Sequence, residues 1–302
     1  MELCTMEELS KVVSSLKNNT AAGPDGITTE DVLKIYPTIN KVLLRVINIC
    51  LQTGHFPKMC KIAKVTPVYK GGDKTEKGNY RPISVTSIFS KILEKIIKNR
   101  MIGFLNISKK QYGFQSDTST QMAIIDLIEF IVKNMERGRE VVAVFVDLKK
   151  AFDTIDIKIL LKKLKKMGFT GLMLQILESF LVNRLQYVVV DGVESKKLKV
   201  QCGVPQGTVL GPLLYLIYVD NIQKANLKGE VLMFADDTVL IYNCEKTNDL
   251  QYIINRDLNL YSEWLNSNKL VLNCQKTVYI HFNRRGLRNP PLNIHIDNNK
   301  LR

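Results

Sequence analysis

The chain has few of the residues that build zinc sites or disulfide frameworks. Its 302 residues include six cysteines and three histidines, and no two cysteines form a C-x-x-C pair. A zinc site is therefore not expected, and the scattered thiols suit a reducing compartment. The chain starts with an acidic segment that has no apolar core, so we expect no secretory signal peptide.

Long apolar runs and acidic residues are also scarce. The longest apolar run, Val209–Val219, contains Gly211-Pro212 and is far shorter than the roughly 20 residues of a membrane-spanning helix. The chain has 29 acidic residues and 43 lysines and arginines, which gives a formal net charge of +14. This surplus favours a polyanionic partner, nucleic acid first and an acidic membrane face second, although a solubilising surface has the same composition.

Periodicity and turn residues predict a mixed fold. The 302 residues, of which 45% are hydrophobic, suffice for one large domain or two lobes. Helices are expected at residues 6–17, 29–51 with an interruption at Pro37, 87–102, 121–136, 157–166, 171–182, up to about 222, and 247–267. Strands are expected at 61–70, 81–83, 141–147, at 187–190 and 198–200 around Asp191-Gly192, and at 231–242, with one or two further strands over 270–282. Without sustained β-α-β alternation, this mixture predicts an α+β fold.

The segment Phe234-Ala235-Asp236-Asp237 lies between two apolar runs and predicts a strand, a tight turn and a second strand. Two-residue hairpin turns favour Asn-Gly or Asp-Gly, which accept positive φ at both turn positions. Two adjacent carboxylates repel each other there, and a divalent cation is the simplest compensation. A third carboxylate, Asp147, ends the apolar run 141–146. Together they would form the ligands of a two-metal phosphoryl-transfer site, with Mg²⁺ favoured. The alternative is an exposed acidic turn and a helix-capping aspartate.

Three further features suit nucleotide binding. The glycines of Gly203-Val204-Pro205-Gln206-Gly207 allow a close approach, so Gln206 could contact a nucleotide, although an ordinary strand-to-helix turn has the same composition. Lys64, Lys70 and Arg81 bracket a glycine-containing loop and could bind polyphosphate, but such clusters are common in basic proteins. Phe152, shortly after Asp147, could fill the space of a ribose 2′-hydroxyl or could be a core aromatic.

These segments resemble the reverse transcriptase domain of non-LTR (LINE-type) retrotransposons, most like the Jockey and CR1 group. The resemblance covers nearly the whole chain, and its matches fall in the order of the family. They are residues 21–27, Asn79–Ser84, Phe89–Lys95, Gln111-Tyr112-Gly113-Phe114, Val146–Asp153, Gly203–Pro212, Phe234–Asp237 and Leu270–Thr277.

The resemblance implies a right-hand polymerase, with fingers over residues 1–140 and, over residues 141–285, a palm whose antiparallel sheet packs on helices. Residues 286–302 would be a truncated tail toward an absent primer grip and thumb. The implied activity is that of an RNA-directed DNA polymerase, whose partners are an RNA template, a DNA primer and dNTPs, with no membrane. Its cofactor would be two Mg²⁺ ions, with Mn²⁺ as a substitute. An intracellular location is implied, nuclear when the element inserts and otherwise cytoplasmic.

The resemblance also assigns residues to roles. Asp147, Asp236 and Asp237 match the metal-binding aspartates, and the Leu148 carbonyl matches a further ligand. Phe152 matches the sugar gate, and Gln206 matches the glutamine that contacts nucleotide and template. The cations expected to bind the triphosphate are Lys64, Lys70 and Arg81. Lys276 matches a lysine that acts as general acid toward pyrophosphate.

Two rival functions remain open on the sequence. A decayed or domesticated copy would bind RNA without making DNA. The intact aspartates argue against this alternative, and the missing thumb favours it. Another palm-fold enzyme, a cyclic-dinucleotide synthase, would carry a Gly-Gly-Asp turn. Gly71-Gly72-Asp73 fits superficially but lacks the Glu-Phe that should follow.

Overall fold

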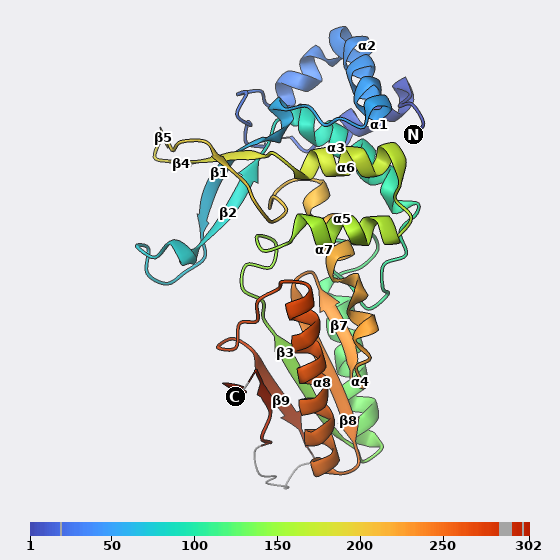
Figure 1. The fold of residues 1–302 in the computed structure, drawn as a ribbon, viewed down its shortest axis with the longest axis vertical. Coiled ribbons are helices and arrows are strands. Elements are labelled where there is room, and N and C mark those ends of the chain that lie inside the picture. Colours follow the sequence, from blue (N-terminus) through green and yellow to red (C-terminus); the bar gives the residue numbers. More distant parts are fainter. Residues whose placement is uncertain (19, 284–291, 298) are drawn as a thin grey trace. The chain divides into compact units, whose positions relative to one another are not determined.

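The computed structural model describes residues 1–18, 20–283, 292–297 and 299–302 (Figure 1). Contacts divide the chain into two compact units, and each unit takes two segments of the sequence. Unit 1 comprises residues 1–105 and 157–214, and unit 2 comprises residues 106–156 and 215–302. The division into fingers over 1–140 and palm over 141–285 stays a prediction, and its residues 284 and 285, with 286–291 and 298 of the predicted tail, lie outside the described residues.

Unit 1 contains a sheet in the order β2-β1-β4-β5, with β6 also paired to β4. Its strands are β1 (Ile62–Tyr69), β2 (Tyr80–Val85), β4 (Leu185–Val190), β5 (Val193–Glu194) and β6 (Leu198–Lys199). The β1–β2 pair is antiparallel, whereas β1 and β4 are parallel. The turn Asp191-Gly192 has positive φ at both residues, 49° and 80°, as an Asp-Gly hairpin turn requires.

Several helices of unit 1 begin at side-chain caps. The helices of this unit are α1 (Met6–Ser14), α2 (Thr29–Thr53), α3 (Ile88–Ile102), α5 (Ile157–Lys166) and α6 (Gly171–Leu181), with short 3-10 helices at Met59–Lys61 and Lys77–Asn79. Thr28 and Asp31 form a capping box at the start of α2. The predicted interruption at Pro37 is wrong, because α2 continues through it. Burial of Leu43, Ile47 and Leu51 beyond the proline offsets the roughly 3 kcal/mol that an internal proline costs.

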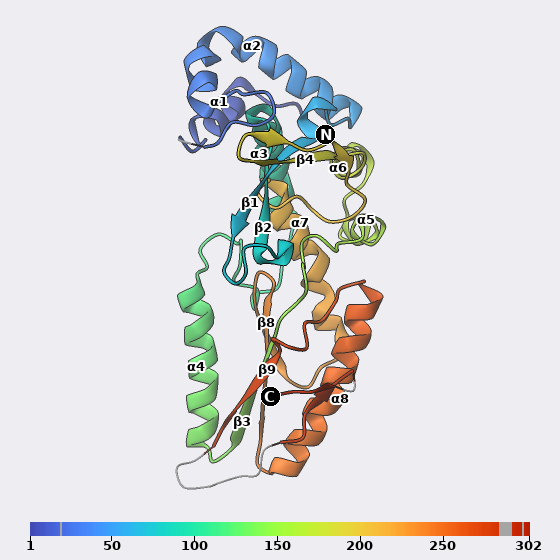
Figure 2. The ribbon, with the colours of Figure 1, turned by 90° about the vertical axis from the view of Figure 1, so that its left-hand side faces the viewer.

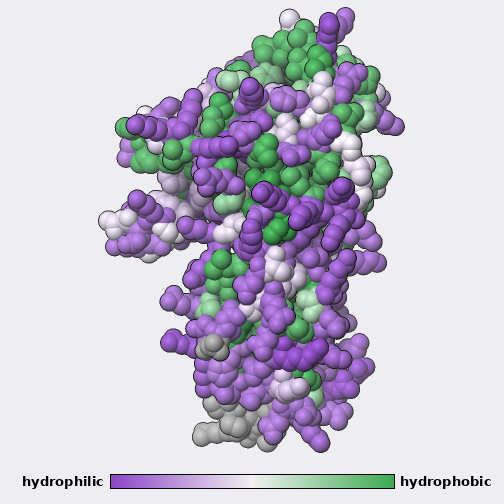
Figure 3. Space-filling view, in the orientation of Figure 1, coloured by the Kyte–Doolittle hydropathy of each residue, from purple (hydrophilic) through white to green (hydrophobic). Residues whose placement is uncertain are grey.

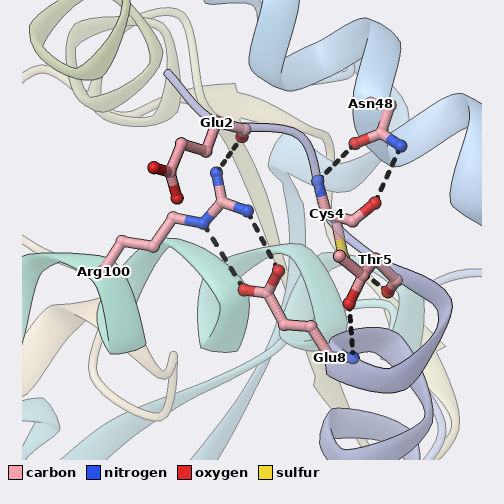
Figure 4. A network of polar contacts seen from close by, with 6 residues as sticks. All are labelled: Glu2, Cys4, Thr5, Glu8, Asn48 and Arg100. Carbon is pink, nitrogen blue, oxygen red and sulfur yellow. Dashed lines mark hydrogen bonds and ion pairs between the residues drawn. The ribbon is translucent and has the colours of Figure 1, made fainter.

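A polar network fixes the residues that precede α1 (Figure 4). The Asn48 side chain on α2 accepts a hydrogen bond from the Cys4 N–H at 2.7 Å and donates to the Cys4 carbonyl at 3.1 Å. Arg100 on α3 pairs with Glu8 at 3.0 Å. One side-chain amide thus satisfies both backbone groups of a residue that lies outside any helix or strand.

Unit 2 contains an antiparallel sheet in the order β7-β8-β3-β9. Its strands are β3 (Glu140–Val146), β7 (Glu230–Phe234), β8 (Asp237–Cys244) and β9 (Val278–Phe282), and β10 (His295–Ile296) pairs separately with β11 (Asn299–Lys300). Helices α4 (Thr120–Glu136) and α8 (Thr247–Ser267) lie on opposite faces of the four-stranded sheet (Figure 2). The core under α4 is formed by Val141, Ala143 and Ile241, against which Leu127, Phe130, Ile131 and Met135 pack.

Helix α7 (Leu210–Val219) belongs to both units, since the division falls between Leu214 and Tyr215. The predicted helix up to about 222 continues beyond α7 as a 3-10 helix, Asp220–Ala225. Every helix in the described part of the chain is too short or too polar to cross a lipid bilayer. Large hydrophobic side chains nevertheless reach the surface at the tip of β4 and β5 (Figure 3), where Val193 is 72% exposed.

Candidate active site

The Phe234–Asp237 segment forms the predicted hairpin turn. Phe234 and Asp237 are the last pair of the β7–β8 ladder, so Ala235 and Asp236 form a two-residue turn. Only Ala235 has positive φ, 56°, whereas the sequence argument expected positive φ at both positions. Positive φ at the first turn residue alone is the pattern of a type II′ turn, which leaves Asp236 in ordinary backbone geometry. The turn therefore tolerates the two aspartates better than the sequence suggested.

Asp147 follows β3 directly and lies beside this turn. The β3–β8 register pairs Val146 with Thr238, so the next step places Asp147 opposite Asp237. Directly opposite residues of an antiparallel ladder carry their side chains on the same face, with Cα atoms about 4.5–5.5 Å apart. Residues far apart in the sequence thus bring carboxylates to one end of the unit 2 sheet, as expected from the apolar run before Asp147.

The charges of the three aspartates affect one another. The pKa of Asp237 is raised, first because surrounding chain partly buries the carboxyl and then because Asp236 and Asp147 carry negative charge nearby. Tyr215, whose side chain is 1% exposed, has its pKa raised well above the ordinary value by burial, with Asp236 and Asp237 contributing. The end of the sheet is therefore a region of concentrated negative charge.

Residues 273–277 hold Asp147 in place. The Asn273 side chain donates to the Asp147 carboxylate at 2.6 Å, and the Asn273 N–H donates to the Asp147 carbonyl at 2.9 Å. The Thr277 hydroxyl accepts the Asp147 N–H at 3.3 Å. Leu148 forms an isolated bridge with Leu272. The predicted strand region 270–282 is accordingly one strand, β9, preceded by a loop that binds the end of β3.

The donor set fits a hard divalent cation. Carboxylate oxygens are the ligands that Mg²⁺ and Mn²⁺ prefer, and a cation would relieve the repulsion that adds to the effect of burial on the pKa of Asp237. As they stand, no three acidic, histidine or cysteine side chains of the described residues are arranged closely enough to hold one ion. Asp147, one of the three, also shares its carboxylate with Asn273. The aspartates therefore supply suitable atoms, and closing the ligand set requires their side chains to come closer together.

Aromatic side chains adjoin the aspartates in unit 2. Phe152 stacks on Tyr215, with ring centroids 4.4 Å apart, and Phe114 meets Phe152 edge to face at 6.1 Å. Phe152 is half-buried, so it packs in this cluster while part of the residue stays accessible. Lys276 is exposed, and its N–H donates to the carbonyl of Asn273, the partner of Asp147.

The predicted triphosphate cations share one face of a hairpin in unit 1. The register pairs Val68 with Arg81, and Lys64 and Lys70 lie an even number of residues from Val68, so all three cations fall on one face. Lys70 and Arg81 are diagonal neighbours. Lys64 lies six residues from Lys70, or roughly 20 Å at about 3.3 Å per residue. Lys70 and Arg81 can thus bind one phosphate chain together, and Lys64 lies further along the strand.

The loop that carries Gln206 lies along the free edge of β2 in unit 1. The Ser84 N–H donates to the Gln206 carbonyl at 2.6 Å. Gly207 has φ of 106°, and a Cβ atom there would lie 2.7 Å from the Ser84 carbonyl oxygen. The loop needs glycine at this position because it approaches the strand so closely. Gln206 therefore lies beside the hairpin of Lys70 and Arg81.

A buried carboxylate anchors the end of this loop. Glu94 on α3 is fully buried and accepts hydrogen bonds from the N–H groups of Val209 and Leu210, at 2.7 and 3.1 Å. The Thr208 hydroxyl accepts the N–H of Gly211 at 3.2 Å, and Pro212 has no N–H to satisfy. All four N–H positions at the start of α7 are thereby accounted for. Burial raises the pKa of Glu94, and buried Arg184 opposes that shift.

Comparison with known proteins decides the family. The family described as "Reverse transcriptase (RNA-dependent DNA polymerase)" matches residues 69–295. The chain belongs to the reverse transcriptase family. This match confirms the resemblance drawn from the ordered motifs, and it includes the three aspartates.

Relatives of this reverse transcriptase domain come from non-LTR elements. It is 28% identical over 295 residues to "RNA-directed DNA polymerase from mobile element jockey" of Drosophila melanogaster, covering 93% of this chain and 32% of the relative. It is 30% identical over 286 residues to "Probable RNA-directed DNA polymerase from transposon BS" of the same organism, covering 90% and 31%. The chain thus spans about a third of the length of the curated relatives it matches.

Solved structures show the same fold. "Structure of apo telomerase from Candida Tropicalis truncated from C-terminal domain" has a TM-score of 0.51 and 14% identity, covering 77% of this chain and 52% of the other. The complex of that telomerase with "TWJ fragment of telomeric RNA" has a TM-score of 0.52 and 13% identity, covering 84% and 45%. The predicted α+β polymerase fold is confirmed.

Among the residues that sequence reasoning missed are two that hold site residues of this reverse transcriptase domain. Asn273 binds the Asp147 carboxylate, and Glu94 anchors the loop of Gln206. Both lie inside the matched stretches Leu270–Thr277 and Phe89–Lys95. The signal available was a polar residue in an otherwise apolar run, Leu270-Val271-Leu272-Asn273, and an acidic residue on the apolar face of an amphipathic helix.

Proposed function

We propose that this reverse transcriptase domain extends a DNA 3′ end on an RNA template by two-metal nucleotidyl transfer. The observation that carries the proposal is that Asp147, directly after β3, and Asp236 and Asp237, at the β7–β8 turn, come to the same end of the unit 2 sheet. Burial raises the pKa of Asp237, and the negative charges of Asp236 and Asp147 raise it further. Such mutual repulsion is a cost that a divalent cation would remove, so it supports a metal-binding role.

The three aspartates, together with the Leu148 carbonyl, would hold two Mg²⁺ ions, or Mn²⁺ in their place. Bound there, the ions would acidify the attacking hydroxyl and offset the phosphate charge. The 3′ oxygen of the DNA primer attacks the α-phosphorus of the dNTP in line, the bond to the β-phosphate oxygen breaks, and pyrophosphate leaves. We propose that Lys276 gives a proton to the leaving pyrophosphate. Its exposure and its place next to Asn273 support this role.

Other residues would bind the incoming nucleotide. Lys70 and Arg81, neighbours on one face of the β1–β2 hairpin, would pair with the triphosphate, with Lys64 further along the same face. Gln206, on the loop beside that hairpin, would contact nucleotide and template. Phe152 would exclude the ribose 2′-hydroxyl with its accessible part. The net charge of +14 suits the RNA template and DNA primer.

The matched relatives are named as polymerases of mobile elements, and this supports an intracellular location for the parent protein. We propose that the parent protein acts in the nucleus when an element inserts and is otherwise cytoplasmic. Imaging of the tagged parent protein tests this location, and exclusion from the nucleus during insertion would contradict it.

Replacing one aspartate tests the proposed chemistry. Asp236→Asn keeps the size of the side chain but removes its charge, so Mg²⁺-dependent extension of oligo(dT) on poly(rA) should fall by about 10²–10³-fold. Fold and RNA affinity should be nearly unchanged. The control is Asp153→Asn, which removes an equal charge from the turn that follows β3 and should keep most of the activity.

Full extension by Asp236→Asn would remove that residue from the site. An unsubstituted chain that binds RNA yet incorporates no nucleotide with Mg²⁺ or Mn²⁺ would favour the RNA-binding alternative. The assay therefore separates the two functions in one experiment.

A further inference from the structure

Ala235, the first residue of the turn between β7 and β8, needs hydrogen-bond partners from elsewhere in the chain. Ala235 is buried, and its φ of 56° lies in the left-handed region, which is unfavourable for residues other than glycine. The last ladder pair is Phe234 with Asp237, so the N–H and carbonyl of Ala235 lie outside the ladder. Buried backbone groups of this kind require hydrogen-bond partners.

One side chain supplies both partners. Gln111, which is 1% exposed, accepts the Ala235 N–H on its Oε1 atom at 2.9 Å. Its Nε2 atom donates to the Ala235 carbonyl at 3.3 Å. The same Oε1 also accepts the N–H of Gly113 at 2.8 Å. The Gln111 amide thus forms a two-sided clamp on the residue that directly precedes Asp236.

The clamp is itself held against β7. The Met233 N–H donates to the Lys110 carbonyl and the Tyr112 N–H donates to the Met233 carbonyl, both at 2.8 Å, so residues 110–112 pair with the strand that leads into the turn. The Tyr112 hydroxyl and Lys110 both bind Asp126 on α4. Gln111 therefore reaches the turn from backbone that is fixed on two sides.

The contact between Gly113 and Ala235 leaves no room for a side chain at residue 113. A Cβ atom at Gly113 would lie 2.2 Å from the Ala235 nitrogen and 2.8 Å from its Cα atom. Only glycine permits this approach without moving the turn. Phe114, the next residue, packs edge to face on Phe152. In the stretch Gln111-Tyr112-Gly113-Phe114, the Gln111 amide and Gly113 thus contact Ala235, and the Phe114 ring contacts Phe152.

We propose that Gln111 is the positioning residue of the aspartate turn: its amide fixes Ala235, and through it the carboxylates of Asp236 and Asp237 beside Asp147. Gln111 acts through the backbone of Ala235, and its bonds are to backbone groups. Residues that orient metal ligands from behind typically change metal affinity or activity about 10–100-fold when replaced. The proposal rests on the proposed function, because it assumes that these aspartates bind metal.

A metal-binding measurement tests the clamp without relying on catalysis. Gln111→Met keeps the size of the side chain and removes both hydrogen-bonding atoms. We expect Mn²⁺ affinity, measured by calorimetry without nucleotide, to fall by about 10–100-fold. We also expect hydrogen exchange at the Ala235 amide to become faster. The matched control is Asn48→Leu, which removes the corresponding amide clamp on Cys4 in unit 1 and should change Mn²⁺ affinity less than twofold.

Three results would overturn the proposal. One is unchanged Mn²⁺ affinity in a folded Gln111→Met, and another is an equal loss of affinity in Asn48→Leu. The third needs no variant: if the Ala235 amide of the unsubstituted chain exchanges as fast as a free turn, the clamp does not hold. A failure of the proposed function has a different signature, because Mn²⁺ binding would then be absent or insensitive to Asp236→Asn while the Ala235 amide stays protected.

Discussion

Phe152 is the residue whose size should decide which sugar is incorporated. Its ring stacks on Tyr215 and meets Phe114, and part of the residue stays accessible. Phe152→Val should admit ribonucleotides, because the smaller side chain no longer excludes a 2′-hydroxyl. Comparing rNTP with dNTP incorporation on one primer measures the effect.

The matched control for that experiment is Phe114→Leu, which trims the same aromatic cluster without replacing the residue matched to the sugar gate. Unchanged discrimination in Phe152→Val would mean that Phe152 serves only the core. Equal relaxation in both variants would point to general loosening of the cluster.

Glu94 should make stability depend on pH. Burial raises its pKa in the folded state, so the folded protein holds this proton more tightly than the unfolded chain. Its contribution is therefore fully present below about pH 4.3, the ordinary pKa of glutamate, and is lost as pH rises through the folded-state pKa. The free energy of unfolding of the unsubstituted chain, relative to Glu94→Gln, should fall as the pH rises above about 4.3. Urea unfolding at several pH values measures this difference, and a difference that grows with pH would contradict it.

Residues of the site differ in how far sequence alone could find them. The aspartates stand in short local patterns, a turn between apolar runs and the end of an apolar run. Asn273, Glu94 and Gln111 act on partners that are 126, 115 and 124 residues away. Local periodicity contains no information about such distant contacts, so these roles emerged only from the folded chain.

At the scale of elements, the β1–β2 hairpin predicts an order of importance among its cations. Lys70 and Arg81 are diagonal neighbours, whereas Lys64 lies several residues along the strand. Lys70→Gln and Arg81→Gln should each raise the KM for dNTP several-fold, and Lys64→Gln should raise it less, because one triphosphate is short compared with the hairpin. Steady-state incorporation assays measure these values. A larger effect of Lys64→Gln than of Arg81→Gln would contradict the arrangement.

Local sequence patterns predicted most helices and strands, but they did not predict which elements pack or pair with one another. The helices at 157–166 and 247–267 have the bounds that periodicity predicts, and the hairpin around 234–237 is where the turn residues place it. The parallel pairing of β1 with β4 joins segments that are distant in sequence. Pro37 lies inside α2, and buried residues beyond the proline stabilise that helix. Tertiary packing decides both, and neither leaves a local signal.

At the scale of the whole molecule, the chain interleaves its two units. Unit 1 takes residues 157–214 from the middle of the chain, so each unit is built from two separate segments of the sequence. The aspartates, Phe152 and Lys276 belong to unit 2, whereas Gln206, Lys64, Lys70 and Arg81 belong to unit 1.

The account depends on Asp147, Asp236 and Asp237 binding divalent metal together. The most direct measurement is a crystal structure with Mn²⁺ and a dNTP, using anomalous scattering to locate the ions. The account predicts anomalous peaks in contact with all three carboxylates. Peaks elsewhere, or a carboxylate of Asp147 that stays more than about 10 Å from those of Asp236 and Asp237, well beyond the roughly 4 Å between paired ions, would contradict it.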